Sequence, residues 1–174
     1  TDVSSTSTAS YISDTIAYGI NYNIPISETS SYGYGAELIL TDYTTTAGSP
    51  NNVRSFINKY GNSHLGLMLR ASLTEDTRNR TVYATQGKKQ SITTNLFVKP
   101  DFDYSYASIK FTGEYNTPYK LNFFDMFTWN TTFQVRPQLG LGTGLLGESN
   151  LPFHDKFFAG GDKTVRGFDS GSLG

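Results

Sequence analysis

The stretch 127–142 reads FTWNTTFQVRPQLGLG, and its side chains alternate strictly between two kinds. One set is mostly apolar: Phe127, Trp129, Thr131, Phe133, Val135, Pro137, Leu139 and Leu141. The other set is polar or small: Thr128, Asn130, Thr132, Gln134, Arg136, Gln138, Gly140 and Gly142. Because successive side chains of a strand point to opposite faces, this period of two predicts a long β-strand with one apolar face.

Five earlier segments show the same alternation, so the sequence predicts six strands that are antiparallel if each pairs with the next. They lie at 16–26, 32–43, 64–74, 92–98 and 107–116, with Ile39 and Met68 as apolar exceptions on the polar faces. Most of the expected strands have about 10 to 15 residues, whereas strands of soluble proteins usually have about 5–6. Since about 9–11 residues of a tilted strand span a bilayer, the pattern favours an all-β membrane fold.

The composition supports strands that face lipid on one side and an enclosed, wet lumen on the other. Of the 174 residues, 14% are aromatic and only 17% are charged, which is below the roughly 25% typical of soluble domains. Aromatic residues near strand ends, among them Tyr18, Tyr32, Tyr104, Tyr106 and Trp129, are predicted to form the interfacial girdles of a barrel. A soluble β-sandwich with aromatic cross-strand pairs is the alternative.

The connections alternate in length, which is typical of bacterial outer-membrane barrels. Residues 27–31 form a short connection, 44–62 a long one in which 53–60 could make one helical turn, and 143–174 the longest. We therefore expect a membrane barrel segment at 1–142 and a long extracellular loop at 143–174, with 27–31, 76–88 and 117–126 on the periplasmic side. Six strands cannot close a barrel, so the chain is predicted to be a piece of a larger one.

The final loop contains FFAGGDKTVRGF at 157–168, and this motif resembles the sixth extracellular loop of the BamA-type outer-membrane insertases. A weaker similarity lies in the connection after the third strand. There Asp76, Arg78 and Gly87 match the family pattern, but Ala84 and Thr85 stand where a proline is expected. The resemblance implies a sixteen-stranded barrel in the bacterial cell outer membrane, of which this chain supplies about strands six to eleven.

The resemblance also implies that the loop folds back into the lumen and is held there by a latch motif. The expected latch residues are Gly160, Gly161, Val165, Arg166, Gly167 and Phe168. Arg166 would form bidentate, charge-assisted bonds with acidic groups on later strands, and the glycines would permit close backbone approach. The alternative is a mobile surface loop with a solvated Arg166.

The sequence predicts no catalytic residue, no metal site and no cofactor. His64 and His154 are far apart and lack metal-ligand spacing, and GGDKT at 160–164 lacks the glycine pattern of a phosphate-binding loop. The net charge of −1 gives no indication of nucleic-acid binding.

The resemblance implies a non-enzymatic role in outer-membrane protein insertion and assembly, in which a barrel opens laterally and pairs its edge with client strands. Expected partners are outer-membrane lipids and lipopolysaccharide, accessory assembly lipoproteins and unfolded outer-membrane protein clients. Three alternatives stay open: a two-partner secretion transporter, the barrel of a patatin-like phospholipase, and a soluble β-sandwich binding module.

Overall fold

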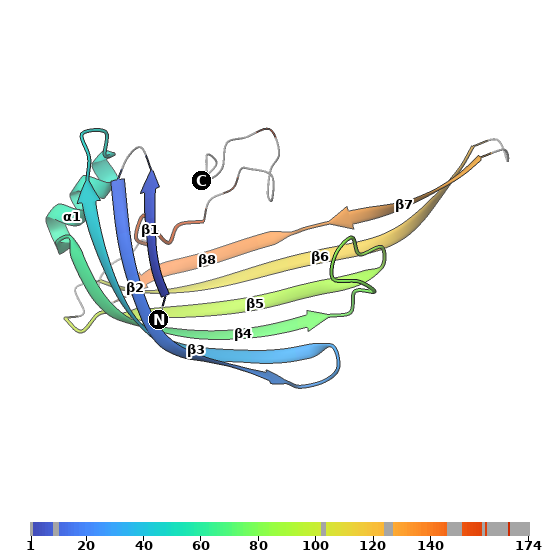
Figure 1. Cartoon of the computed structure of the whole chain (residues 1–174), viewed down its shortest axis with the longest axis horizontal. Helices are drawn as coiled ribbons and strands as arrows, with labels where there is room; N and C mark the ends of the chain where they lie inside the picture. The colour runs from blue at the N-terminus through green and yellow to red at the C-terminus, as the bar shows by residue number, and fades with distance from the viewer. Residues whose placement is uncertain are drawn as a thin grey trace.

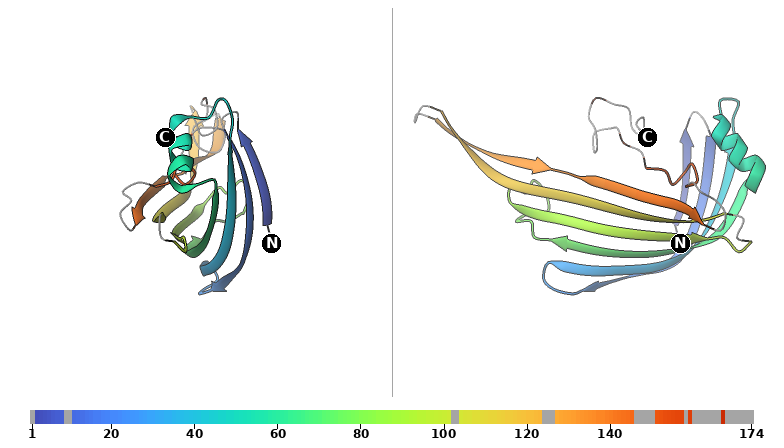
Figure 2. Two further views of the ribbon diagram at one scale, coloured as in Figure 1. Left: turned by 90° about the vertical axis from the view of Figure 1, so that its left-hand side faces the viewer. Right: turned by 180° about the vertical axis from the view of Figure 1, so that it is seen from behind.

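The computed structural model describes residues 2–8, 11–101, 104–123, 127–145, 151–157, 159 and 167. Its strands form one antiparallel sheet in which β1 to β7 lie in sequence order and β8 also pairs with β6. The elements are β1 (Asp2–Thr8), β2 (Tyr11–Pro25), β3 (Ser30–Thr45), α1 (Asn51–Tyr60), β4 (Ser63–Asp76), β5 (Gly87–Val98), β6 (Ser105–Phe123), β7 (Phe127–Val135) and β8 (Gln138–Leu145). The sheet bends into a trough with α1 at one end (Figures 1 and 2).

The six predicted strands are present, and β7 and β8 are two parts of the sixth. Tyr115 of β6 pairs with Val135 and Thr112 pairs with Gln138, so both parts keep one register along β6. Between them, Pro137 has no amide hydrogen for the ladder, but its carbonyl accepts a hydrogen bond from Gly113 N at 2.9 Å. The alternation therefore identified one long strand, which continues to Leu145.

Strand β1 and the helix α1 differ from the prediction. The sequence of β1 is rich in Ser and Thr and has no apolar alternation, so its strand structure depends on pairing with β2. The expected single helical turn is a helix of 10 residues. Its apolar residues Val53, Phe56, Ile57 and Tyr60 recur at helical spacing, and Gly61 ends it with φ +85° and an N–H bond to Ile57 O.

The connection predicted at 117–126 is also different, because most of it is paired strand. Backbone pairing between β6 and β7 runs from Tyr115 with Val135 to Phe123 with Phe127. The hairpin therefore extends much further than the two others at the same end of the sheet (Figure 1).

One face of the sheet, the outer face, exposes the apolar side chains that the alternation predicted. Tyr18 is 69% exposed and Trp129 is 60% exposed. The other exposed apolar side chains of this face include Ile16, Ile20, Tyr22, Ile24, Tyr32, Tyr34, Leu38, Leu65, Leu67, Leu69, Leu73, Ile92, Ile109, Phe133, Leu139 and Leu141. An apolar surface of this extent does not face water in soluble monomers, so the outer face fits contact with lipid. The described residues form a single sheet, unlike the two packed sheets of a soluble sandwich.

The opposite face, the concave inner face, carries the buried side chains. Ile39 and Met68, the two exceptions to the alternation, both lie there, and Met68 belongs to a buried cluster with Phe97, Tyr104 and Tyr106. The predicted place of Tyr104 and Tyr106 in an interfacial girdle is therefore wrong. They are buried because segment 151–157 and α1 cover this end of the inner face.

Within the described ranges, no helix combines the length and the apolar character needed to cross a membrane.

Candidate functional site

Aromatic rings from the sheet, α1 and segment 151–157 meet on the inner face, and we call them the inner aromatic cluster. Its members are Tyr43, Phe56, Tyr60, His64, Phe97, Tyr104, Tyr106, Phe153 and His154. The ring of Phe56 is central, because its centroid lies 5.2 Å from those of both Tyr104 and Phe153. Phe56 thus joins the helix to the sheet and to the segment that follows β8.

Glycines of β8 make room for segment 151–157. A Cβ atom on Gly140 would lie 2.6 Å from Cδ1 of Phe157, and one on Gly142 would overlap the side chain of Leu151. Both glycines occupy inner-face positions in the alternation that starts at 127. The chain after β8 therefore folds back onto the inner face of its own strand, where it is held by Leu151, Phe153 and Phe157.

Two neighbouring titratable groups of this segment, His154 and Asp155, are partly buried, and burial shifts their pKa values in opposite directions. Burial, with a smaller contribution from His64, lowers the pKa of His154 from 6.5 to about 4, so its imidazole is neutral at pH 7. Burial raises the pKa of the Asp155 carboxyl, and the charge of Arg70 partly offsets this. Nδ1 of His154 has no hydrogen-bond partner among the described residues, as expected for a ring held mainly by aromatic contacts.

Acidification is expected to loosen segment 151–157 through His154. The undocked imidazole takes up a proton below pH 6.5, while the docked one resists until about pH 4, so docking weakens as the pH falls between these values. The loss between pH 7 and pH 5 is about 2 kcal/mol by proton linkage. Asp155 opposes this, because protonation of a carboxyl whose pKa is raised favours the docked state.

The measurement is amide exchange of segment 151–157 at pH 7 and pH 5, corrected for intrinsic rates, in the full-length protein. An Asp155→Asn background removes the opposing titration, so acidification should there weaken the docking of segment 151–157 by the full amount. His154→Gln in that background should abolish the pH dependence of amide exchange in segment 151–157. An unchanged pH dependence would show that His154 is not the group responsible.

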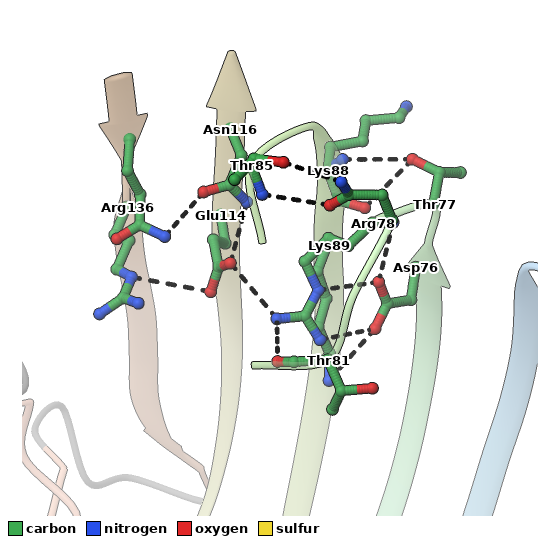
Figure 3. Close-up of polar contacts among 12 residues, drawn as sticks. Asp76, Thr77, Arg78, Thr81, Thr85, Lys88, Lys89, Glu114, Asn116 and Arg136 are labelled. Carbon is green, nitrogen blue, oxygen red and sulfur yellow. Dashed lines mark hydrogen bonds and ion pairs between the residues drawn. The ribbon is translucent and has the colours of Figure 1, made fainter. Parts of the chain in front are cut away.

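A second group of side chains, the Arg78 cluster, lies at the other end of the inner face (Figure 3). Arg78 donates from Nε to Oδ1 of Asp76 at 2.9 Å and from Nη2 to Oδ2 at 2.8 Å, which is a bidentate pair. Its Nη1 reaches Oε1 of Glu114 on β6 at 3.3 Å, and Oε2 of Glu114 lies 3.6 Å from Nε of Arg136. Asn116 also donates to Glu114 at 2.9 Å.

The Arg78 cluster is partly shielded from water. Side-chain exposure is 9% for Arg78 and 19% for Glu114. Hydrogen bonds to Asp76 and then to Glu114 raise the pKa of Arg78 above its usual value, so the guanidinium stays charged. Arg78 thereby ties the β4–β5 connection, residues 77–86, to the inner face of β6.

The β4–β5 connection has a defined backbone. Oδ1 of Asn79 accepts hydrogen bonds from Thr85 N at 3.1 Å and Gln86 N at 3.3 Å. Gly87 has φ +95°, and a Cβ there would overlap the carbonyl of Thr77. Asp76, Arg78 and Gly87, the three residues that match the family pattern, thus help Asn79 to fix this connection. Buried Ala84 stands near the expected proline position.

The predicted latch falls largely outside the described residues. Gly160, Gly161, Val165, Arg166 and Phe168 all lie outside them, so the latch remains a prediction. Gly167 is described and exposed, and its φ of +88° lies in the region that favours glycine. The sequence reasoning missed the inner aromatic cluster. The signals for it were the exceptions Ile39 and Met68 and the helical spacing within α1.

Within the described part of the chain, no three His, Cys, Asp or Glu side chains gather as a metal site would require. A curved antiparallel sheet whose outer face is apolar and exposed, and whose inner face is covered by its own connections, defines the wall of a membrane protein that crosses the bilayer with strands.

The particular family follows from comparison with known proteins. Residues 2–174 match the Omp85 superfamily domain, and the chain belongs to this superfamily. The chain is also 25% identical over 179 residues to the outer membrane protein assembly factor BamA of Neisseria meningitidis serogroup B (strain ATCC BAA-335 / MC58). This match covers 98% of the chain and 21% of that protein, so the chain spans about a fifth of its length. The resemblance to BamA-type proteins and the location in the bacterial outer membrane are thus confirmed.

Proposed function

We propose that this chain is the central wall of a closed barrel that inserts and assembles outer-membrane proteins without enzymatic chemistry. The observation that carries the proposal is the similarity to an outer membrane protein assembly factor along 98% of the chain. In this proposal the segment supplies about strands six to eleven of sixteen, together with the loop after β8. The edge strands that would open and pair with clients lie outside it.

The two covered regions of the inner face support a mechanical role for this segment. The inner aromatic cluster anchors the beginning of the loop after β8, and the Arg78 cluster anchors the β4–β5 connection. Both hold polypeptide against the wall through packing and ion pairs. The proposed partners are unfolded outer-membrane protein clients, accessory assembly lipoproteins, outer-membrane lipids and lipopolysaccharide.

The proposal is tested with the full-length protein in liposomes, by following the folding of a urea-denatured outer-membrane client. Wild type should accelerate folding, and Arg166→Ala should slow assembly at least about tenfold, which corresponds to the loss of one charge-assisted hydrogen bond. Arg80→Ala is the control, since Arg80 is exposed. Arg54 on α1 would be a poorer control than Arg80, because its guanidinium donates a hydrogen bond to the carbonyl of Ala47 at 2.8 Å.

The outcomes separate the function from the latch. If wild type accelerates client folding but Arg166→Ala equals Arg80→Ala, the latch is wrong and the assembly function stands. If wild type has no effect on clients and instead exports a soluble partner protein, the chain belongs to a secretion transporter and the proposed function is wrong.

A further inference from the structure

The β6–β7 hairpin reaches beyond the rest of the sheet. Strand β5 begins at Gly87, which pairs with Asn116, and past this pair β6 has only β7 as a neighbour in the described part of the chain. We call residues 117–123 and 127–133 the hairpin arm. At about 3.3 Å per residue, the seven residues of each of its strands reach about 23 Å past the start of β5. Figures 1 and 2 show this hairpin projecting beyond the other strands.

The hairpin arm is amphipathic. Its outer face carries four aromatic side chains whose exposed fractions are 57% for Tyr119, 66% for Phe127, 60% for Trp129 and 67% for Phe133. The described side chains of its other face are Pro118, Lys120, Asn122, Thr128, Asn130 and Thr132. The outer face of the arm therefore bears no charge among its described residues, while the opposite face is polar.

The arm begins where the lipid-facing surface of the neighbouring strands ends. Glu75 of β4 and Lys88 of β5 occupy outer-face positions and form an ion pair at 3.0 Å. Charges on the lipid side of a transmembrane strand are costly near the membrane centre and tolerated near the interface, so this pair marks the membrane boundary. Lys88 pairs with Tyr115 of β6, and the hairpin arm starts two residues further along β6, at residue 117.

The aromatic face of the arm continues the lipid-facing surface past this boundary. It has the same alternation as the outer face of β6 and β8, and nothing in the described chain covers it. A two-stranded hairpin exposed to water on both faces is only marginally stable. Trp and Tyr side chains prefer the membrane–water interface, and an amphipathic element gains stability by burying its apolar face there.

We propose that the hairpin arm is an interfacial membrane anchor. Its aromatic face lies in the boundary between headgroups and acyl chains of the phospholipid leaflet at this end of the sheet, and its polar face is turned to water. The proposal depends on the outer-membrane location of the family, but it is independent of the assembly function. A protein partner on the aromatic face is the competing occupant.

Trp129 is the single tryptophan of this chain and reports directly on the proposal. The full-length protein is reconstituted in vesicles of phosphatidylcholine, with or without bromine atoms at defined depths of the acyl chains. The difference between wild type and Trp129→Phe isolates the emission of Trp129. We expect blue-shifted emission and at least about twofold quenching, stronger for shallow than for deep bromine, as befits an interfacial side chain.

A neighbouring residue on the opposite face provides the control. Asn130→Trp in the Trp129→Phe background should give water-exposed, unquenched emission, and Lys120→Trp serves if that variant does not fold. Unquenched, red-shifted emission from Trp129 would overturn the proposal, because the arm would stand in water. Blue-shifted emission without quenching would also overturn the proposal, since a protein surface would then cover the aromatic face of the hairpin arm.

Discussion

Arg78→Ala is expected to lower the free energy of unfolding of the full-length protein by about 3 kcal/mol, the cost of breaking a shielded ion pair from one side. The substitution removes a cation held between two carboxylates, with a bidentate pair to Asp76 and a bond to Glu114 at 3.3 Å. Among the described residues, Glu114 would keep its contacts with Arg136 and Asn116. The β4–β5 connection would also lose its tie to β6.

The measurement is the urea midpoint in detergent micelles, read from the loss of the heat-modifiable band on gels. Arg80→Ala is the matched control, since Arg80 is an exposed arginine of the same connection. The urea midpoint of Arg78→Lys should lie between those of Arg78→Ala and Arg80→Ala, because an ammonium keeps the charge but cannot form the bidentate pair. Adding Glu114→Gln to Arg78→Ala should recover part of the loss, because it removes the carboxylate left without its arginine. Equal urea midpoints for Arg78→Ala and Arg80→Ala would show that the Arg78 cluster contributes no more than an ordinary surface contact.

The alternation of side chains predicted most of the sheet, because the outer face of a membrane strand is selected for one property along its whole length. Tyr18, Leu38 and Trp129 lie where this pattern puts them. The pattern could not find β1, whose Ser and Thr residues carry no period and which forms by pairing with β2. It also stopped the fifth strand at residue 116, whereas β6 continues past this point and its Pro118 lies in register with Thr132 of β7.

The inner face was harder to predict for a different physical reason. A lumen-facing position can be polar where water fills the space and apolar where a loop covers it, so alternation alone does not say which. Ile39 and Met68 were visible as exceptions, but their partners come from α1 and from segment 151–157, far away in sequence. Arg78 and Glu114 are 36 residues apart, and only the register of β4 with β5 and of β5 with β6 brings them together.

Phe56→Ala is expected to release α1 and segment 151–157 from the sheet while leaving the strands paired. The ring of Phe56 lies 5.0 to 5.3 Å from those of Tyr60, His64, Tyr104 and Phe153, so its removal leaves a void between three elements. Phe56 is partly buried, so its replacement by Ala should cost about 3 kcal/mol, the lower end of the range for a fully buried Phe. Because α1 has no side-chain cap at its N-terminus and is only ten residues long, packing is its main source of stability.

The loss should be local, and amide exchange measures it. Exchange in α1 and in segment 151–157 should accelerate about 100-fold in Phe56→Ala, while amides of the β2–β3 ladder stay unchanged. Asn58→Ala is the control, since Asn58 is exposed on the same helix. Acceleration that extends equally to the β2–β3 ladder would show that the cluster is not a separate unit. Only residues 158 and 159 separate this anchored segment from Gly160, the first residue of the predicted latch, so Phe56→Ala should also slow client assembly to a similar degree as Arg166→Ala. Normal assembly by Phe56→Ala would mean that the latch holds the loop without the inner aromatic cluster.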